Sequence, residues 1–280
     1  MLEIDNILVK RITDKALMED IGQGDITTSS IVAAGQMIEA QIVAKDIGVI
    51  AGLPLVEQVF KTLSQEIIFN AQVKEGQKIS NNEIVAVVSG PAEVILSGER
   101  VALNFLQRLS GIASITAQYV ASVADYSAKI VDTRKTTPGL RVLEKYAVRA
   151  GGGYNHRFGL HDMILIKDNH IKAAGGIVNA VTRARKHTSP YIKIEVEVEN
   201  INQVYEALSA KADVIMLDNM TNYTMEDAVK VINGRALVEA SGCITLERVR
   251  GIAETGVDLI SVGALTHSVK ALDLSLNLVK

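Results

Sequence analysis

The residues best suited to chemistry lie in the segment Val131-Asp132-Thr133-Arg134-Lys135-Thr136-Thr137-Pro138-Gly139. Arg134 and Lys135 follow directly after the apolar, β-prone run 128–131, so two cations are expected at one edge of a sheet. In α/β proteins this edge is where ligands usually bind. A guanidinium is a planar fork that matches a carboxylate or phosphate, and an ammonium is a compact point charge. The pair predicts a small substrate with several negative charges.

Five later β-prone runs also end in polar residues or glycine. The runs are 163–166, 192–198, 214–217, 236–240 and 259–262, and helical patterns at 141–149, 177–187, 204–210, 225–232 and 246–254 alternate with them. Such alternation indicates a parallel sheet, and the even spacing of the last four runs favours a barrel. An eight-fold barrel needs about 250 residues and only about 150 are available, so we predict a six-stranded, incomplete α/β barrel.

The polar residues at these strand ends fall into three chemical groups. The cations are Arg134, Lys135 and Lys167, with His156 and Arg157 from the glycine-rich loop 151–157. The carboxylates of Glu197 and Asp218 could hold a metal or sugar hydroxyls, or stabilise a developing cation. Ser241-Gly242 and Gly263 precede helices expected near Thr245 and Ala264, where glycine and N–H groups favour phosphate. Together these groups predict a phosphorylated sugar beside a carboxylated acceptor.

Residues 1 to about 113 have a different hydrophobic pattern, which predicts a mixed α/β domain. Strands are expected at 37–44, 47–50, 67–73 and 79–88, and a helix at 53–63. A long helix is expected from Ser97 to about Ala124, with Gly111 as a candidate break. Glu75-Gly76-Gln77 is interpreted as a turn. By itself Arg100 is equally consistent with a solvated helix charge and a functional cation.

Composition excludes several classes of protein. The chain has 280 residues, of which 48% are hydrophobic, and a net charge of -3, so we expect one large or two medium domains. Aromatic residues make up 4% and tryptophan is absent, which together with the negative charge argues against nucleic-acid binding. The single cysteine, Cys243, fits a reducing cytoplasm. We expect neither a signal peptide nor a membrane span.

Several of these residues have alternative interpretations. Glu195, Glu197 and Glu199 share one face of their strand, which is either a barrel interior or the surface of an ordinary sheet. His156, His161 and His170 have spacings that match no common zinc site. A Schiff base on Lys135 or Lys167 is a further alternative, and the glycines at 151–153 are equally typical of a helix stop.

At these motifs the sequence resembles the quinolinate phosphoribosyltransferase family. The resemblance is carried, in order, by Gly24-Asp25-Ile26-Thr27-Thr28, residues 132–139, Gly152-Gly153-Tyr154-Asn155-His156-Arg157, Ile166-Lys167-Asp168-Asn169-His170, residues 195–200, Met216-Leu217-Asp218-Asn219 and residues 261–268. It runs almost end to end. Ser241-Gly242 is followed by Cys243, where the family often has Gly or Asn, and this departure leaves the details of the phosphate corner open.

The resemblance implies an enzyme that joins quinolinate to 5-phosphoribosyl-1-pyrophosphate with magnesium, giving nicotinate mononucleotide, pyrophosphate and carbon dioxide for NAD synthesis. It implies a mixed α/β sandwich domain over 1–113, a barrel over 114–268, and residues 269–280 returning to the first domain. It also implies a homodimer or higher homo-oligomer whose sites share Arg100 across subunits.

The resemblance also assigns roles to single residues. The substrate-binding set is Arg100, Thr133, Arg134, Lys135, His156, Arg157, Lys167, Glu197, Asp218, Ser241, Gly242, Gly263 and His267, and the catalytic set is Lys135, Lys167, Glu197 and Asp218. Glu197 and Asp218 would stand near magnesium. Two competing hypotheses are a paralogue linked to molybdenum utilisation with another acceptor, and a catalytically silent anion-binding regulator.

Overall fold

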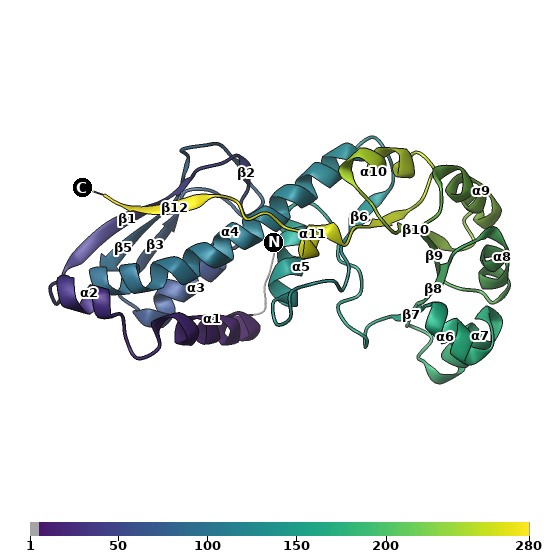
Figure 1. Ribbon diagram of the computed structural model, residues 1–280, viewed down its shortest axis with the longest axis horizontal. Coiled ribbons are helices and arrows are strands. Elements are labelled where there is room, and N and C mark those ends of the chain that lie inside the picture. Colours follow the sequence, from purple (N-terminus) through teal and green to yellow (C-terminus); the bar gives the residue numbers. More distant parts are fainter. Residues whose placement is uncertain (1–5, 280) are drawn as a thin grey trace. The chain divides into compact units, whose positions relative to one another are not determined.

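The computed structural model of the chain describes residues 6–279 (Figure 1). The described chain forms two compact units that interleave along the sequence. The first unit holds the residues up to Ala117, residues 136–152 and those from Ser268 on, and the second holds residues 118–135 and 153–267. The sequence predicted boundaries near residues 113 and 268, with the C-terminal residues returning to the first domain; here the segment 136–152 also belongs to the first unit.

The first unit is built on a four-stranded antiparallel sheet in the order β12-β1-β5-β3. Its strands are β1 (Met37–Ala44), β3 (Ile68–Ala71), β5 (Ile84–Pro91) and β12 (Leu274–Leu278), and β2 (Gly48–Val49) pairs with β4 (Lys78–Ile79) in a separate ribbon. Along β1 every second residue from Ala40 to Ala44 is fully buried, which is the alternation of a half-buried strand. The last strand of the chain therefore lies beside β1 in the sheet of the first unit (Figure 1).

Four helices of the first unit accompany this sheet. They are α1 (Asn6–Ile21), α2 (Ile26–Ile31), α3 (Leu53–Leu63) and α4 (Ala92–Ser122), and the last of these continues into the second unit. Val56, Val59 and Phe60 of α3 form one core with Ile42 of β1 and Leu106 of α4. Burial of such side chains contributes about 1.5–3 kcal/mol each. The helices α1 and α2 were not predicted.

The predicted break in the long helix at Gly111 is wrong, because α4 is continuous from Ala92 to Ser122. The glycine serves close packing instead. A Cβ atom at position 111 would collide with the carbonyl oxygen of Lys270 and stand 3.2 Å from the Cα atom of Ala271. Gly111 thus lets the returning chain cross the helix surface.

The predicted strand 79–88 is two strands, β4 and β5, separated by a turn. Asn82 at that turn has a φ of 67°, and its amide donates to the carbonyl oxygen of Ala44. The left-handed conformation interrupts the extended chain, and asparagine tolerates this conformation better than most residues. Because apolar residues stand on both sides of the turn, the segment 79–88 was interpreted as one strand.

Glu75 does more than form the predicted turn. Its carboxylate accepts hydrogen bonds from the amides of Gly52 and Leu53 at the start of α3, at 3.0 and 2.6 Å, and from the Tyr146 hydroxyl at 2.6 Å. Burial raises the pKa of Glu75, although these hydrogen bonds oppose the rise. An acceptor at a helix start satisfies amides that have no partner inside the helix.

The helix α5 (Arg141–Ala150) lies in the first unit and is held there by a buried charge. Glu144 has no exposed surface and accepts from the Nε and Nη2 atoms of Arg108 at 3.0 and 2.6 Å. It also accepts from the amide of Thr137 at 3.1 Å. Gly151 caps the C-terminus of α5, as expected for a helix stop.

The second unit contains the predicted six-stranded parallel sheet. Its order is β6-β11-β10-β9-β8-β7, with β6 (Lys129–Val131) and β7 (Ile164–Ile166) as the two edges, so the ring of strands is incomplete. The other strands are β8 (Ile194–Val198), β9 (Val214–Asp218), β10 (Leu237–Ser241) and β11 (Leu259–Ser261).

Helices follow most strands of this sheet, and α7 to α10 lie on its outer side (Figure 1). They are α6 (Asp168–Ala174), α7 (Ile177–His187), α8 (Ile201–Ser209), α9 (Asn222–Ile232), α10 (Leu246–Ala253) and α11 (Ala264–His267). Of these, α6 was not predicted, because it is short and its residues 168–174 are mostly polar or small. Among residues 6–279 no helix combines the length and apolar character needed to cross a membrane.

Candidate active site

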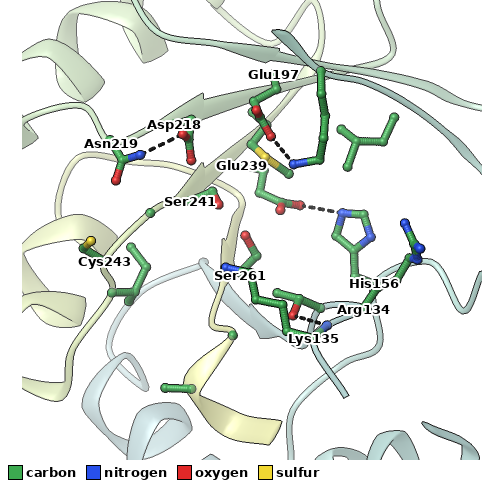
Figure 2. Close-up of a pocket in the computed structure, with 18 of the residues that line it drawn as sticks. Arg134, Lys135, His156, Glu197, Asp218, Asn219, Glu239, Ser241, Cys243 and Ser261 are labelled. Atoms are coloured by element: carbon green, nitrogen blue, oxygen red, sulfur yellow. Dashed lines mark hydrogen bonds and ion pairs between the residues drawn. The ribbon is translucent and has the colours of Figure 1, made fainter. Parts of the chain in front are cut away.

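A pocket of about 900 Å³ opens in the second unit at the C-terminal ends of the parallel strands (Figure 2). Twelve of the thirteen predicted site residues line it: Thr133, Arg134, Lys135, His156, Arg157, Lys167, Glu197, Asp218, Ser241, Gly242, Gly263 and His267. The thirteenth, Arg100, lies on α4 in the first unit, with a side chain 59% exposed and 3.9 Å from Glu99. The structure thus brings twelve of the predicted residues together in one pocket of the second unit.

The register of the strands explains why these side chains meet. Ser241 pairs with Asp218 between β10 and β9, and Met216 pairs with both Glu197 and Glu239. Residues paired across neighbouring strands point to the same face, and residues two apart in one strand do so as well. Glu197, Asp218 and Ser241 therefore project from one inner face of the sheet into the pocket.

Lys167 and Glu197 form an ion pair on the pocket wall. Lys167 Nζ lies 2.5 Å from Glu197 Oε2, with the two side chains 46% and 15% exposed. Lys167 stands at the N-cap of α6, and its amide donates to Nδ1 of His170 at 2.9 Å. The cap fixes the backbone of Lys167, and the ion pair with Glu197 fixes the position of its ammonium group. His170 thereby has a local structural role.

The segment after β6 is anchored from both sides. The Lys135 amide donates to Thr133 Oγ1 at 3.1 Å, and the Lys135 carbonyl accepts from Thr266 Oγ1 at 2.7 Å. A Cβ atom at Gly263 would lie 3.1 Å from both the Lys135 and the His267 side chains. Glycine at 263 therefore leaves room for two basic residues to flank the start of α11.

The corner after β10 contains two consecutive left-handed residues. Gly242 has a φ of 92°, and a Cβ atom there would collide with the side chain of Asn219. Cys243 has a φ of 47° and is exposed. Its carbonyl accepts from Nη1 of Arg248 at 2.7 Å. Glycine and asparagine adopt this conformation more readily than other residues. The backbone at position 243 therefore favours the two residues that the family often has there, and Cys243 is less well suited to it.

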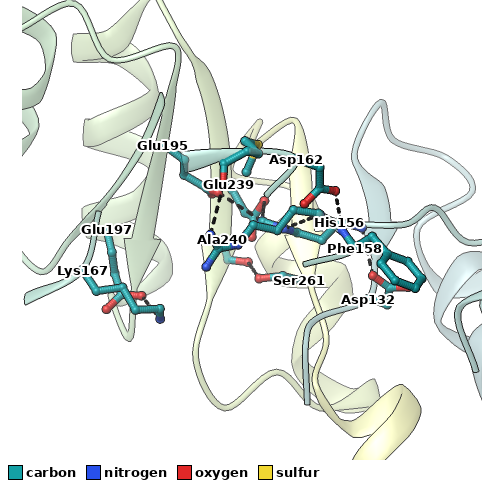
Figure 3. A network of polar contacts seen from close by, with 12 residues as sticks. Asp132, His156, Phe158, Asp162, Lys167, Glu195, Glu197, Glu239, Ala240 and Ser261 are labelled. Atoms are coloured by element: carbon teal, nitrogen blue, oxygen red, sulfur yellow. Dashed lines mark hydrogen bonds and ion pairs between the residues drawn. The ribbon is translucent and has the colours of Figure 1, made fainter. Parts of the chain in front are cut away.

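A buried carboxyl pair, Glu195 and Glu239, lies next to His156 (Figure 3). Glu195 is 0% exposed and Glu239 is 1% exposed, and their Oε2 atoms lie 3.1 and 3.5 Å from His156 Nε2. One ligand atom from each of the three residues lies within 4.8 Å of the others. Glu239 lines the pocket and was not predicted. Its signal was a single acidic residue inside the apolar run 236–240, two positions before Ser241.

The interior interpretation of the strand 194–198 is confirmed for two of its three glutamates. Glu195 is buried, Glu197 is half-buried at the pocket, and Glu199 lies past the end of β8 and is exposed. Inward-facing carboxylates are expensive unless they are paired or protonated. Glu197 meets this requirement with Lys167, and Glu195 with His156.

His156 does not stand in the pocket as a free cation. Its Nδ1 accepts from the amide of Arg157 at 2.7 Å, while Nε2 faces the two glutamates. The carboxylate of the buried Asp132 accepts hydrogen bonds from Asn155 Nδ2 at 2.6 Å and from the His156 amide at 2.9 Å. The structure therefore places His156 in a hydrogen-bonded chain that runs from the barrel interior to Arg157.

Electrostatics in the pocket reflect the crowding of like charges. Burial raises the pKa of Glu239 to about 8, with the negative charge of Glu195 adding to the rise. Burial also lowers the pKa of Arg157, and the neighbouring Arg134 lowers it further. Two arginines held close together are relieved by a bound anion, which favours anionic ligands.

The fold and the pocket define an α/β-barrel protein whose pocket is lined by several cationic side chains and two accessible carboxylates. The sequence matches the family "Quinolinate phosphoribosyl transferase, N-terminal domain" over residues 25–110 and its "C-terminal domain" over residues 112–277. It is 48% identical over 274 residues to the "Probable nicotinate-nucleotide pyrophosphorylase [carboxylating]" of Bacillus subtilis, covering 98% of this chain and 94% of that protein.

Solved structures give the same result. The nicotinate-nucleotide pyrophosphorylase of Francisella tularensis superposes with a TM-score of 0.95 at 41% identity, over 99% of this chain and 98% of that one. NadC of Streptococcus pyogenes also has a TM-score of 0.95 at 41% identity, over 99% of each chain. The chain belongs to the quinolinate phosphoribosyltransferase family.

Proposed function

We propose that the protein transfers the phosphoribosyl group of 5-phosphoribosyl-1-pyrophosphate to quinolinate with decarboxylation. The products are nicotinate mononucleotide, pyrophosphate and carbon dioxide, and the reaction serves NAD biosynthesis. The observation that carries the proposal is one pocket in which Arg134, Lys135, Arg157 and Lys167 surround Glu197 and Asp218. Family membership supports the choice of substrates.

The cations divide between the two substrates. Guanidinium groups bind carboxylates through two parallel hydrogen bonds, so Arg134 and Arg157 suit the two carboxylates of quinolinate. Lys135 and Lys167 are point charges that suit the pyrophosphate and the charge that develops as it leaves. The 5-phosphate would occupy the corner of Ser241, Gly242 and Gly263, with His267 beside it, where glycines allow a close approach to the backbone.

Glu197 and Asp218 fit magnesium. Hard divalent cations take carboxylate oxygens and retain water, and both side chains are only partly buried at the pocket. When bound, magnesium would neutralise charge on the pyrophosphate. Lys167 already pairs with Glu197 and Asn219 with Asp218 at 2.7 Å, so both carboxylates are held in place by protein contacts.

The chemistry requires no covalent enzyme intermediate. The ring nitrogen of quinolinate attacks the anomeric carbon, and the bond to pyrophosphate breaks. Glu197 and Asp218 place negative charge beside the positive charge that develops on the sugar. The pyridinium then accepts the electron pair released when the adjacent carboxylate leaves as carbon dioxide, and the ring carbon takes up a proton.

We further propose a homodimer in which Arg100 of the partner subunit completes the cationic set. The proposal is supported by the exposed side chain of Arg100 on α4 and by its match to the family motif Ser97-Gly98-Glu99-Arg100. The test mixes an Arg100→Ala chain with a Lys135→Ala chain. Mixed dimers should regain activity at one of two sites, whereas no recovery after demonstrated subunit exchange contradicts a shared site. The single exposed cysteine is consistent with a cytoplasmic location.

The decisive experiment incubates the purified protein with quinolinate, 5-phosphoribosyl-1-pyrophosphate and magnesium, and measures nicotinate mononucleotide and carbon dioxide. Both should form, and nicotinate as acceptor should give neither. Lys172→Ala serves as the matched control for charge removal, because this lysine is 74% exposed and pairs with Asp168 outside the pocket lining. No product from the folded protein would contradict the proposal and redirect the search to another aromatic acid acceptor.

A further inference from the structure

The proposed reaction gives no role to the buried carboxyl pair. Glu195 of β8 and Glu239 of β10 converge on His156, almost without solvent contact. Three of their four oxygens, both of Glu195 and Oε1 of Glu239, have no hydrogen-bond partner within the described chain, and Oε2 of Glu195 has the His156 imidazole 3.1 Å away as its facing group. Two such groups in a core are costly, so a specific requirement must offset the cost.

The requirement is visible at the imidazole of His156. Because Nδ1 accepts the Arg157 amide at 2.7 Å, this nitrogen carries no proton. The proton of the neutral ring must then lie on Nε2, which faces Glu195 at 3.1 Å and Glu239 at 3.5 Å. The ring is 9% exposed, so water offers little competition. Which nitrogen is protonated is set by what the other one binds.

The backbone before Arg157 is fixed independently. Tyr154 bonds to the edge strand β6, through Tyr154 N to the Ile130 carbonyl at 2.9 Å and Asp132 N to the Tyr154 carbonyl at 3.1 Å. Asp132 then fixes Asn155 and the amide of His156. At Arg157 these β6 contacts end, and the imidazole holds the next amide.

We propose that Glu195 and Glu239 are positioning residues for Arg157, acting through His156. The two carboxyls fix the Nε2–H tautomer and the ring orientation, and Nδ1 then fixes the backbone that carries the Arg157 guanidinium to the pocket. This inference rests on the proposed function, because it assumes that Arg157 binds a substrate carboxylate. It also assigns His156 a supporting role, with neither ring nitrogen directed at the substrate.

A misplaced guanidinium affects one substrate more than the other. Bidentate carboxylate binding depends on both hydrogen bonds of the fork, so a small rotation of Arg157 weakens the binding of quinolinate. The lysines and the phosphate corner are held by other contacts, through Thr266 and the α6 cap. The KM for 5-phosphoribosyl-1-pyrophosphate should therefore change little.

The experiment compares Glu195→Leu and Glu239→Leu with Glu195→Gln and Glu239→Gln. The leucine variants remove an acceptor and should raise the quinolinate KM by at least about tenfold, with a smaller effect on the other KM. The glutamine variants keep an acceptor oxygen and should restore most of the affinity. Glu75→Gln is the matched control, a half-buried, hydrogen-bonded carboxyl of the first unit, which should affect stability and leave both KM values unchanged.

A second measurement does not depend on activity or on the folding of the Glu195 and Glu239 variants. Nitrogen-15 NMR of the wild-type protein, with the His156 signal assigned by its loss in His156→Gln, should show a protonated Nε2 and an unprotonated Nδ1 at neutral pH. The opposite tautomer, or leucine variants with unchanged quinolinate KM, would overturn the positioning role. If the wild-type protein makes no nicotinate mononucleotide, the proposed function fails, while the tautomer still tests the Glu195–Glu239–His156 arrangement.

Discussion

Raising the pH from 6 to 9 should destabilise the protein through Glu239. Its pKa is raised from 4.5 to about 8, first by burial and then by Glu195, while His156, a hydrogen bond from Ser261 and Lys167 act in the opposite direction. Because the folded pKa lies above the unfolded one, the folded state binds the extra proton. The resulting stabilisation is fully present below pH 4.5 and is lost as the pH rises through 8.

The magnitude follows from linkage. Between the two pKa values, the stability falls by about 1.4 kcal/mol per pH unit for one proton. Between pH 6 and pH 9, an interval that includes the folded pKa of about 8, the free energy of unfolding falls by about 3 kcal/mol. For a protein of this size, that corresponds to a decrease in Tm of roughly 5 to 10 °C. Because the two glutamates face one imidazole, the apparent pKa belongs to the pair.

The assay is thermal unfolding of wild type and Glu239→Gln at a series of pH values at constant ionic strength. Titrating groups away from this cluster are common to both proteins and cancel in the difference, so the change reports on the carboxyl pair and the facing imidazole together. Glutamine is neutral throughout, so the gap between the two curves should change by about 3 kcal/mol between pH 6 and 9. Parallel curves would refute the assignment of a shared, buried proton to this pair.

Three other substitutions give separable outcomes. Lys135→Ala should lower kcat by about 100-fold, and Tm should stay unchanged because the side chain is exposed. Steady-state kinetics measures this, and a variant with full activity would contradict the role of Lys135. Gly111→Ala should destabilise by about 3 kcal/mol, since its Cβ would collide with the Lys270 carbonyl oxygen; urea unfolding measures this. Glu144→Leu should cost about 2 to 3 kcal/mol, because the guanidinium of Arg108, 33% exposed, loses the carboxylate that faces it. An unchanged urea midpoint would contradict this.

Periodicity predicted the parts of the fold whose burial is regular. The strand 37–44 and the helices 53–63 and 177–187 match their predicted bounds because apolar residues recur at one period along each. The helices α1 and α6 carry weaker patterns and were missed. Gly111 was misread because a helix breaker and a close-packing glycine have the same sequence signature, and only the crossing chain at Lys270 separates them.

The site was predictable where side chains follow strand ends, because parallel strands bring their C-terminal ends together. That rule predicts that Lys167, Asp218 and Gly263 lie close together, and all three line the pocket. It could not find Glu239, which lies inside its strand and depends on the register of its neighbours. Nor could it show that His156 uses both ring nitrogens within the protein, since hydrogen-bond direction is not encoded in spacing.

The pairing of β12 with β1 has a consequence for synthesis of the chain. During translation, β1 emerges early, whereas residues 274–278 emerge only after the whole second unit. Until then one edge of β1 presents unpaired amides and carbonyls, the kind of edge that recruits other strands. The first unit thus completes its sheet last, and a nascent chain shortened before Leu274 should aggregate, although its pocket residues are all present.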